Sequence, residues 1–277
     1  MRESSPSSLD RRDPVAAIMD LAYDLAGIRL GDMKRPLVEG RLGKRLRQLG
    51  CDMKTYAQRC REDVCEQTIL IDLLTTNHSA WRREPAHFED LETRVLPAII
   101  ARQKNMPRPK LRIWCAAAAT GEEPYTLALS LIRAIPDIAR WDALILATDI
   151  STRALARAKA GIYTQERVAP LPPSDHALAL AVHEVGPPKV YTVRHELRSL
   201  IQFARMNLMD EWPMKGPFDA IFCRNVMIYF DHETQTRLVN RMAALLPKGG
   251  TLYVGHSESL ANIRHPLTGL RPAAYVA

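Results

Sequence analysis

The chain has 277 residues, of which 47% are hydrophobic and 25% are charged, and its formal net charge is +7. This length and composition predict a globular protein with one large and one small domain. They exclude a membrane-spanning helix, because the apolar runs at 144–147 and 177–182 fall far short of the roughly 20 residues it needs. No signal peptide opens the sequence, so we expect a cytoplasmic protein.

The cysteines and the positive charge indicate which kinds of site and partner to expect. The odd number of cysteines, without a Cys-x-x-Cys pair, predicts reduced thiols and no metal site; they are Cys51, Cys60, Cys65, Cys115 and Cys223. Residues 26–62 hold ten basic residues against four acidic ones. This surplus predicts an acidic partner, and charge alone leaves nucleic acid, an anionic membrane surface and an acidic protein open.

The chain begins with a predicted flexible tail and a small helical domain. Residues 1–14 are polar and charged, so they lack the apolar side chains whose burial would offset the entropy lost on folding. Over residues 15–75 apolar positions recur at intervals of three and four, as in Ile18, Leu21, Ala22 and Leu25, which predicts an all-helical domain. Its basic face is either a solvated helix surface or a docking surface.

A linker at 76–88 leads into a large α/β domain at 89–277, which begins with a helix near 88–103. Short β-branched and aromatic runs then alternate with helical stretches, which predicts a doubly wound parallel sheet with strands at 111–117, 144–150, 201–207, 219–226 and 251–255. Residues 273–276 would add an edge strand. Prolines and a strand-like alternation at 190–194 predict a small antiparallel insertion at about 170–200.

Ligands of open α/β sheets bind beyond the carboxyl ends of the strands, so the turn after each strand is informative. The first turn, at 116–124, contains four alanines and Gly121, which let a ligand approach the backbone closely. It lacks the Gly-x-Gly-x-x-Gly pattern, and Glu122 and Glu123 would repel a pyrophosphate. A positively charged cofactor therefore fits better than a phosphate-bearing one.

The later turns add further candidates. Asp149 would accept hydrogen bonds from ribose hydroxyls or else cap a helix. Asn207 and Leu208 would grip an adenine ring. Arg224 and Asn225 lie in an apolar run that ends with Tyr229, so they form either part of a site or a structural hydrogen-bond cluster.

Several motifs in this order resemble those of the CheR family, the chemotaxis receptor glutamate O-methyltransferases. They are Thr-Thr-Asn at 75–77, Arg-Glu-Pro-x-His-Phe at 83–88, Thr-Gly-Glu-Glu-Pro-Tyr at 120–125, Ala-Thr-Asp-Ile at 147–150, Phe-Asp-Ala-Ile-Phe-Cys-Arg-Asn-Val-Met-Ile-Tyr-Phe at 218–230 and Gly-His-Ser-Glu-Ser at 255–259. The resemblance also covers the helical region through Gly27, Lys34 and Arg45. It therefore includes nearly everything beyond the tail.

The resemblance implies a Rossmann-like class I S-adenosylmethionine methyltransferase domain with a small inserted β-subdomain, preceded by the all-helical domain. It implies that S-adenosyl-L-methionine is the cofactor and S-adenosyl-L-homocysteine its product. Arg83 and Tyr229 would face the reacting methyl group. The cofactor pocket would be lined by Asn77, Ser79, Arg83, Glu122, Asp149, Asn207, Leu208, Cys223, Arg224 and Asn225.

The resemblance also implies the partner, the cytoplasmic domain of a methyl-accepting chemotaxis receptor. Its methylation region would be contacted by the basic N-terminal helices through Arg41, Arg45 and Arg47. We expect a monomer that binds neither nucleic acid nor metal and does not insert into a membrane. The chain departs from the family at Trp81 and Arg82, where two phenylalanines are usual, and at Ser79, where threonine is common.

The expected chemistry needs no general base, because a glutamate carboxylate is already ionised at neutral pH. This agrees with the lack of an obvious Ser-His-Asp or Cys-His arrangement in the sequence. Two other readings remain. One is a nucleic-acid methyltransferase, which the positive charge permits, and the other is a protein that senses S-adenosylmethionine without catalysis.

Overall fold

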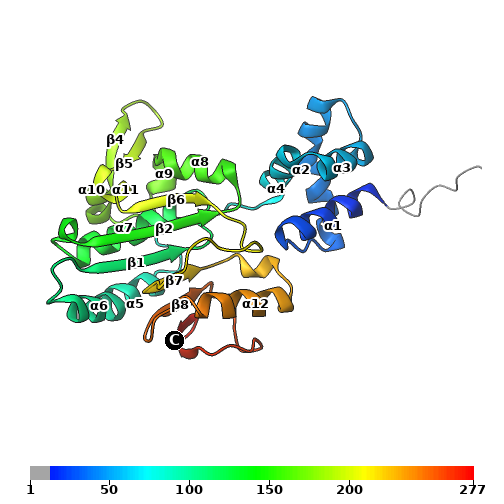
Figure 1. Cartoon of the computed structure of the whole chain (residues 1–277). Coiled ribbons are helices and arrows are strands. Elements are labelled where there is room, and N and C mark those ends of the chain that lie inside the picture. The colour runs from blue at the N-terminus through cyan, green and yellow to red at the C-terminus, as the bar shows by residue number, and fades with distance from the viewer. Residues whose placement is uncertain (1–12) are drawn as a thin grey trace, which may run out of the picture. The chain divides into compact units, whose positions relative to one another are not determined.

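The computed structural model describes residues 13–277. Nearly all of the predicted tail therefore lies outside the described residues. The chain divides into two compact units (Figure 1). Unit 1 contains the described residues up to Thr76 together with Tyr229–Asp231, and unit 2 contains Asn77–Ile228 and His232–Ala277.

Unit 1 is helical, as predicted. It contains α1 (Pro14–Ala26), α2 (Arg35–Leu49), α3 (Met53–Glu62), α4 (Val64–Leu74) and a short 3-10 helix, η2 (Asp32–Lys34). Aspartates accept hydrogen bonds from the first backbone N–H groups of α1, α3 and α4, and glycines in the left-handed conformation end α1 and α2. The unit has its own core, which includes Ile18, Leu42, Tyr56 and Leu70.

Two of the three arginines predicted to contact the receptor are engaged inside unit 1. Arg41 donates to the backbone oxygens of Leu74 and Thr75. Arg45 forms a two-pronged ion pair with Glu66, with nitrogen–oxygen distances of 2.8 and 2.6 Å. Arg47 is exposed. Arg41 and Arg45 thus also have partners within unit 1, and contact of the three arginines with a receptor stays a prediction.

Unit 2 is built on a seven-stranded sheet in the order β6-β2-β1-β7-β8-β10-β9 (Figure 1). The strands are β1 (Lys110–Cys115), β2 (Asp142–Asp149), β6 (Ile201–Arg205), β7 (Ala220–Cys223), β8 (Thr251–Val254), β9 (Thr268–Arg271) and β10 (Ala274–Val276). The first five are parallel, whereas β9 and β10 are antiparallel. The doubly wound sheet and its terminal edge are confirmed, but β9 was not predicted because its four residues are all exposed.

Helices surround this sheet. They are α5 (Ala86–Asp90), a π-helical turn η3 (Leu91–Val95), α6 (Leu96–Gln103), α7 (Glu122–Ala134), the 3-10 turn η4 (Ile138–Arg140), α8 (Thr152–Ala160) and α12 (His232–Ala243). The segment from α5 to α6 is the helix predicted near 88–103. Pro97 has no N–H to donate, which interrupts the regular hydrogen-bond ladder next to the π-turn. Leu111, Phe222 and Tyr253 belong to the core under these helices.

A second, three-stranded sheet lies between α8 and β6 in sequence. Its antiparallel order is β3-β5-β4, with β3 at Ile162–Thr164, β4 at Leu180–Glu184 and β5 at Val190–Val193. Three short helices accompany it, α9 (Gln165–Val168), α10 (Pro173–Ala179) and α11 (His195–Arg198). We call residues 162–200 the insertion. It starts earlier than the predicted 170–200, because β3 pairs with β5 along Ile162–Thr164.

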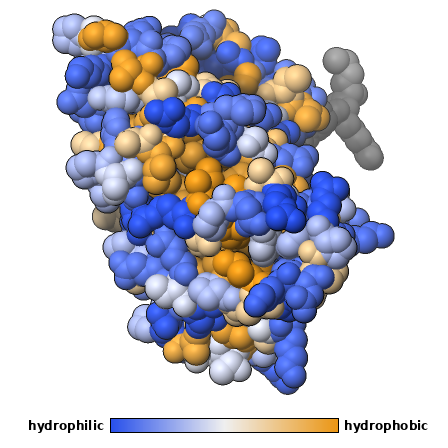
Figure 2. Space-filling view, turned by 90° about the vertical axis from the view of Figure 1, so that its left-hand side faces the viewer, coloured by the Kyte–Doolittle hydropathy of each residue, from blue (hydrophilic) through white to orange (hydrophobic). Residues whose placement is uncertain are grey.

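The surface is mixed. Figure 2 shows a face on which hydrophilic residues cover most of the area and hydrophobic residues gather in a central band. Apolar surface of this kind is normal in folded proteins, which lack enough polar side chains to cover it. Within residues 13–277, every helix is too short or too polar to cross a membrane. All five cysteines are free thiols, as predicted.

Candidate functional site

The order of the strands locates the candidate site. From β1 the chain proceeds through β2 to β6 on one side, and β7 then lies on the other side of β1. The turns after β1 and β7 therefore diverge at the carboxyl edge of the sheet, and such a switch point is where open α/β sheets bind ligands. The residues predicted for the site follow β1, β2, β6 and β7, or belong to the linker before α5.

The turn after β1 is closely packed. Ala119 and Gly121 have positive φ angles of 46° and 99°. A Cβ atom on Gly121 would lie 2.8 Å from the hydroxyl oxygen of Tyr163 and 2.9 Å from Cβ of Ala158, so only glycine fits. The Ala118 N–H also donates to the backbone oxygen of Thr148, which joins this turn to the end of β2.

Asp149 connects three segments at this edge. One carboxylate oxygen accepts from the N–H of Ala119 at 2.8 Å and the other from the N–H of Ser151 at 2.9 Å. The Ser151 hydroxyl in turn accepts from the Asn77 side chain at 3.2 Å and from Ala154 N–H at the start of α8. Ser151, and not Asp149, is therefore the helix cap, and the linker, the first turn and β2 meet here.

Glu122 is 0% exposed and already has partners. Its carboxylate accepts from the Thr120 hydroxyl at 2.7 Å and from the Arg167 guanidinium. Arg167 lies in α9 of the insertion and was not predicted as a functional residue. The structure thus places a cation from the insertion beside a carboxylate predicted to contact the cofactor.

Arg224 is held by protein groups. The residue is 4% exposed, and its guanidinium donates to Glu123, to Glu84 at 3.0 Å and to the backbone oxygen of Arg83 at 2.6 Å. Burial lowers the pKa of Arg224, but the two carboxylates outweigh it and raise the pKa above its ordinary value. Of the two roles predicted for Arg224, the structure shows the hydrogen-bond cluster. This cluster fixes the linker against β7.

Glu84 completes that cluster. It also accepts from the Asn225 side chain at 3.2 Å and from the backbone N–H of His256 at 3.2 Å. Burial opposes its ionisation, but the Arg224 guanidinium outweighs burial and holds the pKa of Glu84 below its ordinary value.

Asn225 takes a positive φ of 56°, which ends the predicted strand at 219–226 early, at Cys223. The Glu258 carboxylate supports this bend by accepting from the N–H groups of Asn225 at 2.7 Å, Gly255 at 2.6 Å and Ile228 at 3.3 Å. Burial raises the pKa of Glu258 above its ordinary value, although these hydrogen bonds act in the opposite direction. Sequence reasoning assigned Glu258 no role; its only signal was the Gly-His-Ser-Glu-Ser motif.

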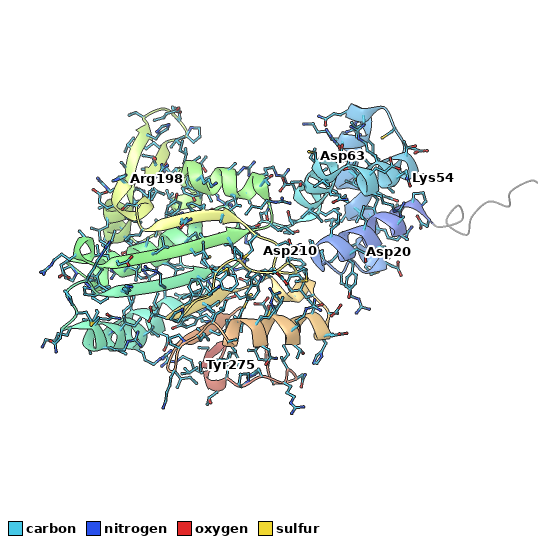
Figure 3. All side chains as sticks on the ribbon, in the orientation of Figure 1. Asp20, Lys54, Asp63, Arg198, Asp210 and Tyr275 are labelled. Carbon is cyan, nitrogen blue, oxygen red and sulfur yellow. The ribbon has the colours of Figure 1, made fainter. Side chains whose placement is uncertain are left out.

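The remaining candidates occupy separate places. Ser79 is buried, and Arg83 donates to the backbone oxygen of His78 at 3.2 Å. Cys223 is buried at the end of β7, and burial raises its pKa well above the ordinary value. Asn207 bonds within its own turn after β6, to Met209 N–H and to Asp210, which Figure 3 labels, and Leu208 beside it is buried.

Tyr229 belongs to unit 1, whereas the other ten candidate site residues belong to unit 2. Its backbone oxygen accepts from Arg29 N–H at 2.8 Å, and the Lys34 ammonium lies 5.5 Å from its ring centroid. Tyr229 is therefore surrounded by residues of unit 1, although it follows Arg224 and Asn225 closely in the sequence.

The hydrogen-bond acceptors at the carboxyl edge suit a ligand with hydroxyl groups. Asp149, Glu122 and Glu123 are carboxylates, which accept hydrogen bonds. Glu122 and Glu123 are already paired with Arg167 and Arg224. The small residues of the first turn permit close approach of a ligand to the backbone. These features fit S-adenosylmethionine, with Asp149 as the acceptor at the end of β2.

Comparison with known proteins identifies the family of this chain. The family model for the CheR methyltransferase SAM binding domain matches residues 77–274, and the model for the CheR methyltransferase all-alpha domain matches residues 14–75. A protein named chemotaxis protein methyltransferase 2 from Pseudomonas aeruginosa is 39% identical over 268 residues, which are 95% of this chain and 92% of that protein. The chemotaxis protein methyltransferase of Escherichia coli K12 is 39% identical over 257 residues, 91% of this chain and 86% of that protein.

Among solved structures, an S-adenosylmethionine-dependent methyltransferase from Mesorhizobium loti has 17% identity and a TM-score of 0.31, over 59% of this chain and 54% of that one. That likeness is too low to support an assignment. The two family domains together account for residues 14–75 and 77–274, and relatives near 39% identity extend over most of the chain. The chain therefore belongs to the CheR methyltransferase family and is an S-adenosylmethionine-dependent methyltransferase.

Proposed function

We propose that this methyltransferase esterifies glutamate side chains on the cytoplasmic domain of methyl-accepting chemotaxis receptors. The observation that carries the proposal is the match of both family domains, because the relatives that share them are named chemotaxis protein methyltransferases. The convergence of Asn77, Asp149 and the first turn at one edge of the sheet supports it. We also propose that the enzyme is cytoplasmic and monomeric.

S-adenosylmethionine, when bound, supplies a methyl group on a positively charged sulfur and leaves as S-adenosylhomocysteine. The protein's task is positioning, because the glutamate carboxylate is already an anionic nucleophile at neutral pH. In a site that excludes water, the approach of the anion to a cation is favoured. No residue is needed to remove a proton.

The residues would share this work as follows. Asp149 accepts hydrogen bonds from the cofactor's hydroxyl groups, and the small residues of the first turn leave space beside it. Arg83 orients the incoming carboxylate. Arg224 supports Arg83 by bonding to its backbone oxygen at 2.6 Å, so its role is to position the linker. Asn77, Ser79, Glu122, Asn207, Leu208, Cys223 and Asn225 complete the cofactor pocket.

The receptor would dock on the exposed cations of unit 1. Arg47 and Lys54 are exposed, and neither is needed to neutralise the buried Glu66, which Arg45 already contacts (Lys54 is labelled in Figure 3). Receptor methylation regions that carry glutamates are acidic, so complementary charge would accelerate encounter.

The test is to incubate the protein with methyl-labelled cofactor and receptor-bearing membranes. We expect label in the receptor that is lost in base as methanol, since methyl esters are base-labile. Arg83→Ala should lower turnover strongly while S-adenosylhomocysteine still binds to a folded protein. Base-stable label in added RNA or DNA would instead make it a nucleic-acid methyltransferase, and cofactor binding without methyl transfer would make it a sensor.

A further inference from the structure

The insertion contacts the first turn through two polar side chains. The Tyr163 hydroxyl donates to the backbone oxygen of Thr120 at 2.7 Å. The Arg167 guanidinium donates to the Thr120 hydroxyl at 2.8 Å and forms an ion pair with Glu122. Because Glu122 is fully buried, removal of its cation would leave an uncompensated charge, which is costly in a protein interior.

The insertion also contacts the linker, which precedes α5 and contains Arg83. The Trp81 ring is buried and packs with the edge of Tyr163, at a centroid distance of 5.5 Å. Arg82 follows it with a φ of 50°, and its backbone N–H donates to the Thr126 hydroxyl. Its guanidinium reaches α10, where it lies 3.4 Å from Asp175.

Asp175 is 1% exposed and is shared by two arginines from outside the insertion. Arg82 approaches one carboxylate oxygen, and Arg133 of α7 donates to the other at 2.9 Å. This accounts for the arginine at 82, where the family resemblance leads one to expect phenylalanine. In this chain a buried charge on the insertion is paired with a cation on the linker as well as with Arg133 of α7.

The insertion thus holds two segments that both contribute to the candidate cofactor pocket, the first turn through Arg167 and the linker through Asp175. We propose that Arg167 and Asp175 are positioning residues, so that cofactor affinity depends on the insertion although neither residue contacts the cofactor. The proposal rests on the function proposed above and adds a dependence of the cofactor site on a peripheral subdomain.

The first experiment measures S-adenosylhomocysteine binding by calorimetry for Arg167→Met, Arg167→Lys and a control, Arg198→Met. Arg198, labelled in Figure 3, also ties the insertion to the core, through the backbone oxygens of Lys159 and Ala160 at 3.0 Å each, but it contacts neither cofactor segment. Loss of a charge-assisted hydrogen bond predicts about tenfold weaker binding for Arg167→Met. Arg167→Lys should bind with intermediate affinity and Arg198→Met like the unmodified protein.

Steady-state kinetics then separate positioning from general damage. Arg167→Met should raise the KM for S-adenosylmethionine and leave the KM for the receptor unchanged. Equal binding by Arg167→Met and the unmodified protein, or equal losses in Arg167→Met and Arg198→Met, would overturn the proposed role of Arg167. If the unmodified protein itself does not bind S-adenosylhomocysteine, the proposed function has failed and not only the role of the insertion.

The second experiment uses a double-mutant cycle of Arg82→Phe and Asp175→Leu. Each single variant should weaken cofactor binding, because Arg82→Phe leaves the buried Asp175 with Arg133 alone and Asp175→Leu removes the carboxylate that both arginines share. The double variant removes both charges and should recover most of the affinity. Losses that simply add in the double variant would show that the pair does not position the linker.

Discussion

Glu258 shows how a single buried side chain can organise several backbone segments. Its carboxylate accepts from Asn225 and Gly255, so it joins the loop after β7 to the end of β8. Asn225 is held in a left-handed conformation that residues other than glycine rarely adopt. The hydrogen bonds that Glu258 accepts offset the cost of that conformation and keep the loop beside the linker.

Gly255→Ala tests this arrangement. An added Cβ would lie 2.4 Å from the Asn225 side-chain nitrogen and 2.7 Å from the nearer Glu258 oxygen, so both must move. We expect a loss of about 1–3 kcal/mol in the free energy of unfolding, with weaker S-adenosylhomocysteine binding. Urea unfolding and calorimetry measure the two effects. Gly40→Ala is the control, since nothing lies within 4 Å of its added Cβ; equal behaviour of the two variants would contradict the prediction.

His87 is a second residue whose surroundings determine its properties. It is 2% exposed, and neither ring nitrogen makes a hydrogen bond within the described part of the chain. Its ring packs against those of Tyr253 and His256. Burial, together with the nearby Arg224 charge, lowers the pKa of His87 from 6.5 to about 4, so the imidazole is neutral in the folded protein at neutral pH.

This shift predicts the pH dependence of stability. Between pH 6.5 and about 4 the unfolded chain binds a proton at His87 and the folded protein does not. The free energy of unfolding is therefore highest above pH 6.5. It falls as the pH drops towards 4, by about 3 kcal/mol in total. His87→Phe keeps a ring but cannot titrate, so its urea midpoint should decline less over this window. The same decline in both proteins would exclude His87 as the cause.

At the scale of elements, a buried ion pair joins α2 to α4 and so has a structural role. Glu66 in α4 is 2% exposed, and the hydrogen bonds from Arg45 in α2 hold the pKa of its carboxyl below the ordinary value. Arg59 of α3 lies 3.7 Å from the same carboxylate, so three helices converge on it. The basic face of unit 1 is thus partly structural and partly available to a partner.

Arg45→Gln and Arg47→Gln separate these two uses of charge. Without Arg45 the buried Glu66 keeps only its more distant cation, so we expect Arg45→Gln to cost about 3 kcal/mol of unfolding free energy. Arg47→Gln should leave stability within about 0.5 kcal/mol of the unmodified protein and slow receptor methylation. Thermal unfolding and initial rates measure these outcomes, and equal stability of the two variants would refute the assignment of Arg45.

At the scale of the whole molecule, the net charge of +7 would favour encounter with the acidic receptor proposed above. Cofactor binding depends on short-range contacts within unit 2, whereas receptor encounter depends on long-range charge. The two should therefore respond differently to salt.

Raising the ionic strength from about 0.05 to about 0.3 M shortens the range over which exposed charges act. We expect kcat/KM for the receptor to fall about tenfold over this range, while the affinity for S-adenosylhomocysteine changes less than about twofold. Methylation rates and calorimetry at matched salt concentrations provide the measurement. A parallel loss of both quantities would mean that salt acts on the cofactor site and not on encounter.

The fold could be predicted because hydrophobic periodicity is a local property. The alternation of apolar runs and helices can be recognised in the sequence around β1, β2 and β7, because buried parallel strands are largely apolar. β9, β3 and β4 were missed because their residues are mostly exposed or too few to carry such a pattern.

The sequence by itself determined the family and the cofactor, because each depends on residue types at fixed spacings, and it predicted the turns that would hold that cofactor. Only the tertiary structure decided which charged residues are partners of one another. Arg167 meets Glu122, Arg82 meets Asp175 and Arg45 meets Glu66 across 45, 93 and 21 residues of chain. Burial makes such pairing obligatory, but any cation in reach can satisfy a buried carboxylate, so the choice of partner is fixed by packing and not by spacing along the chain.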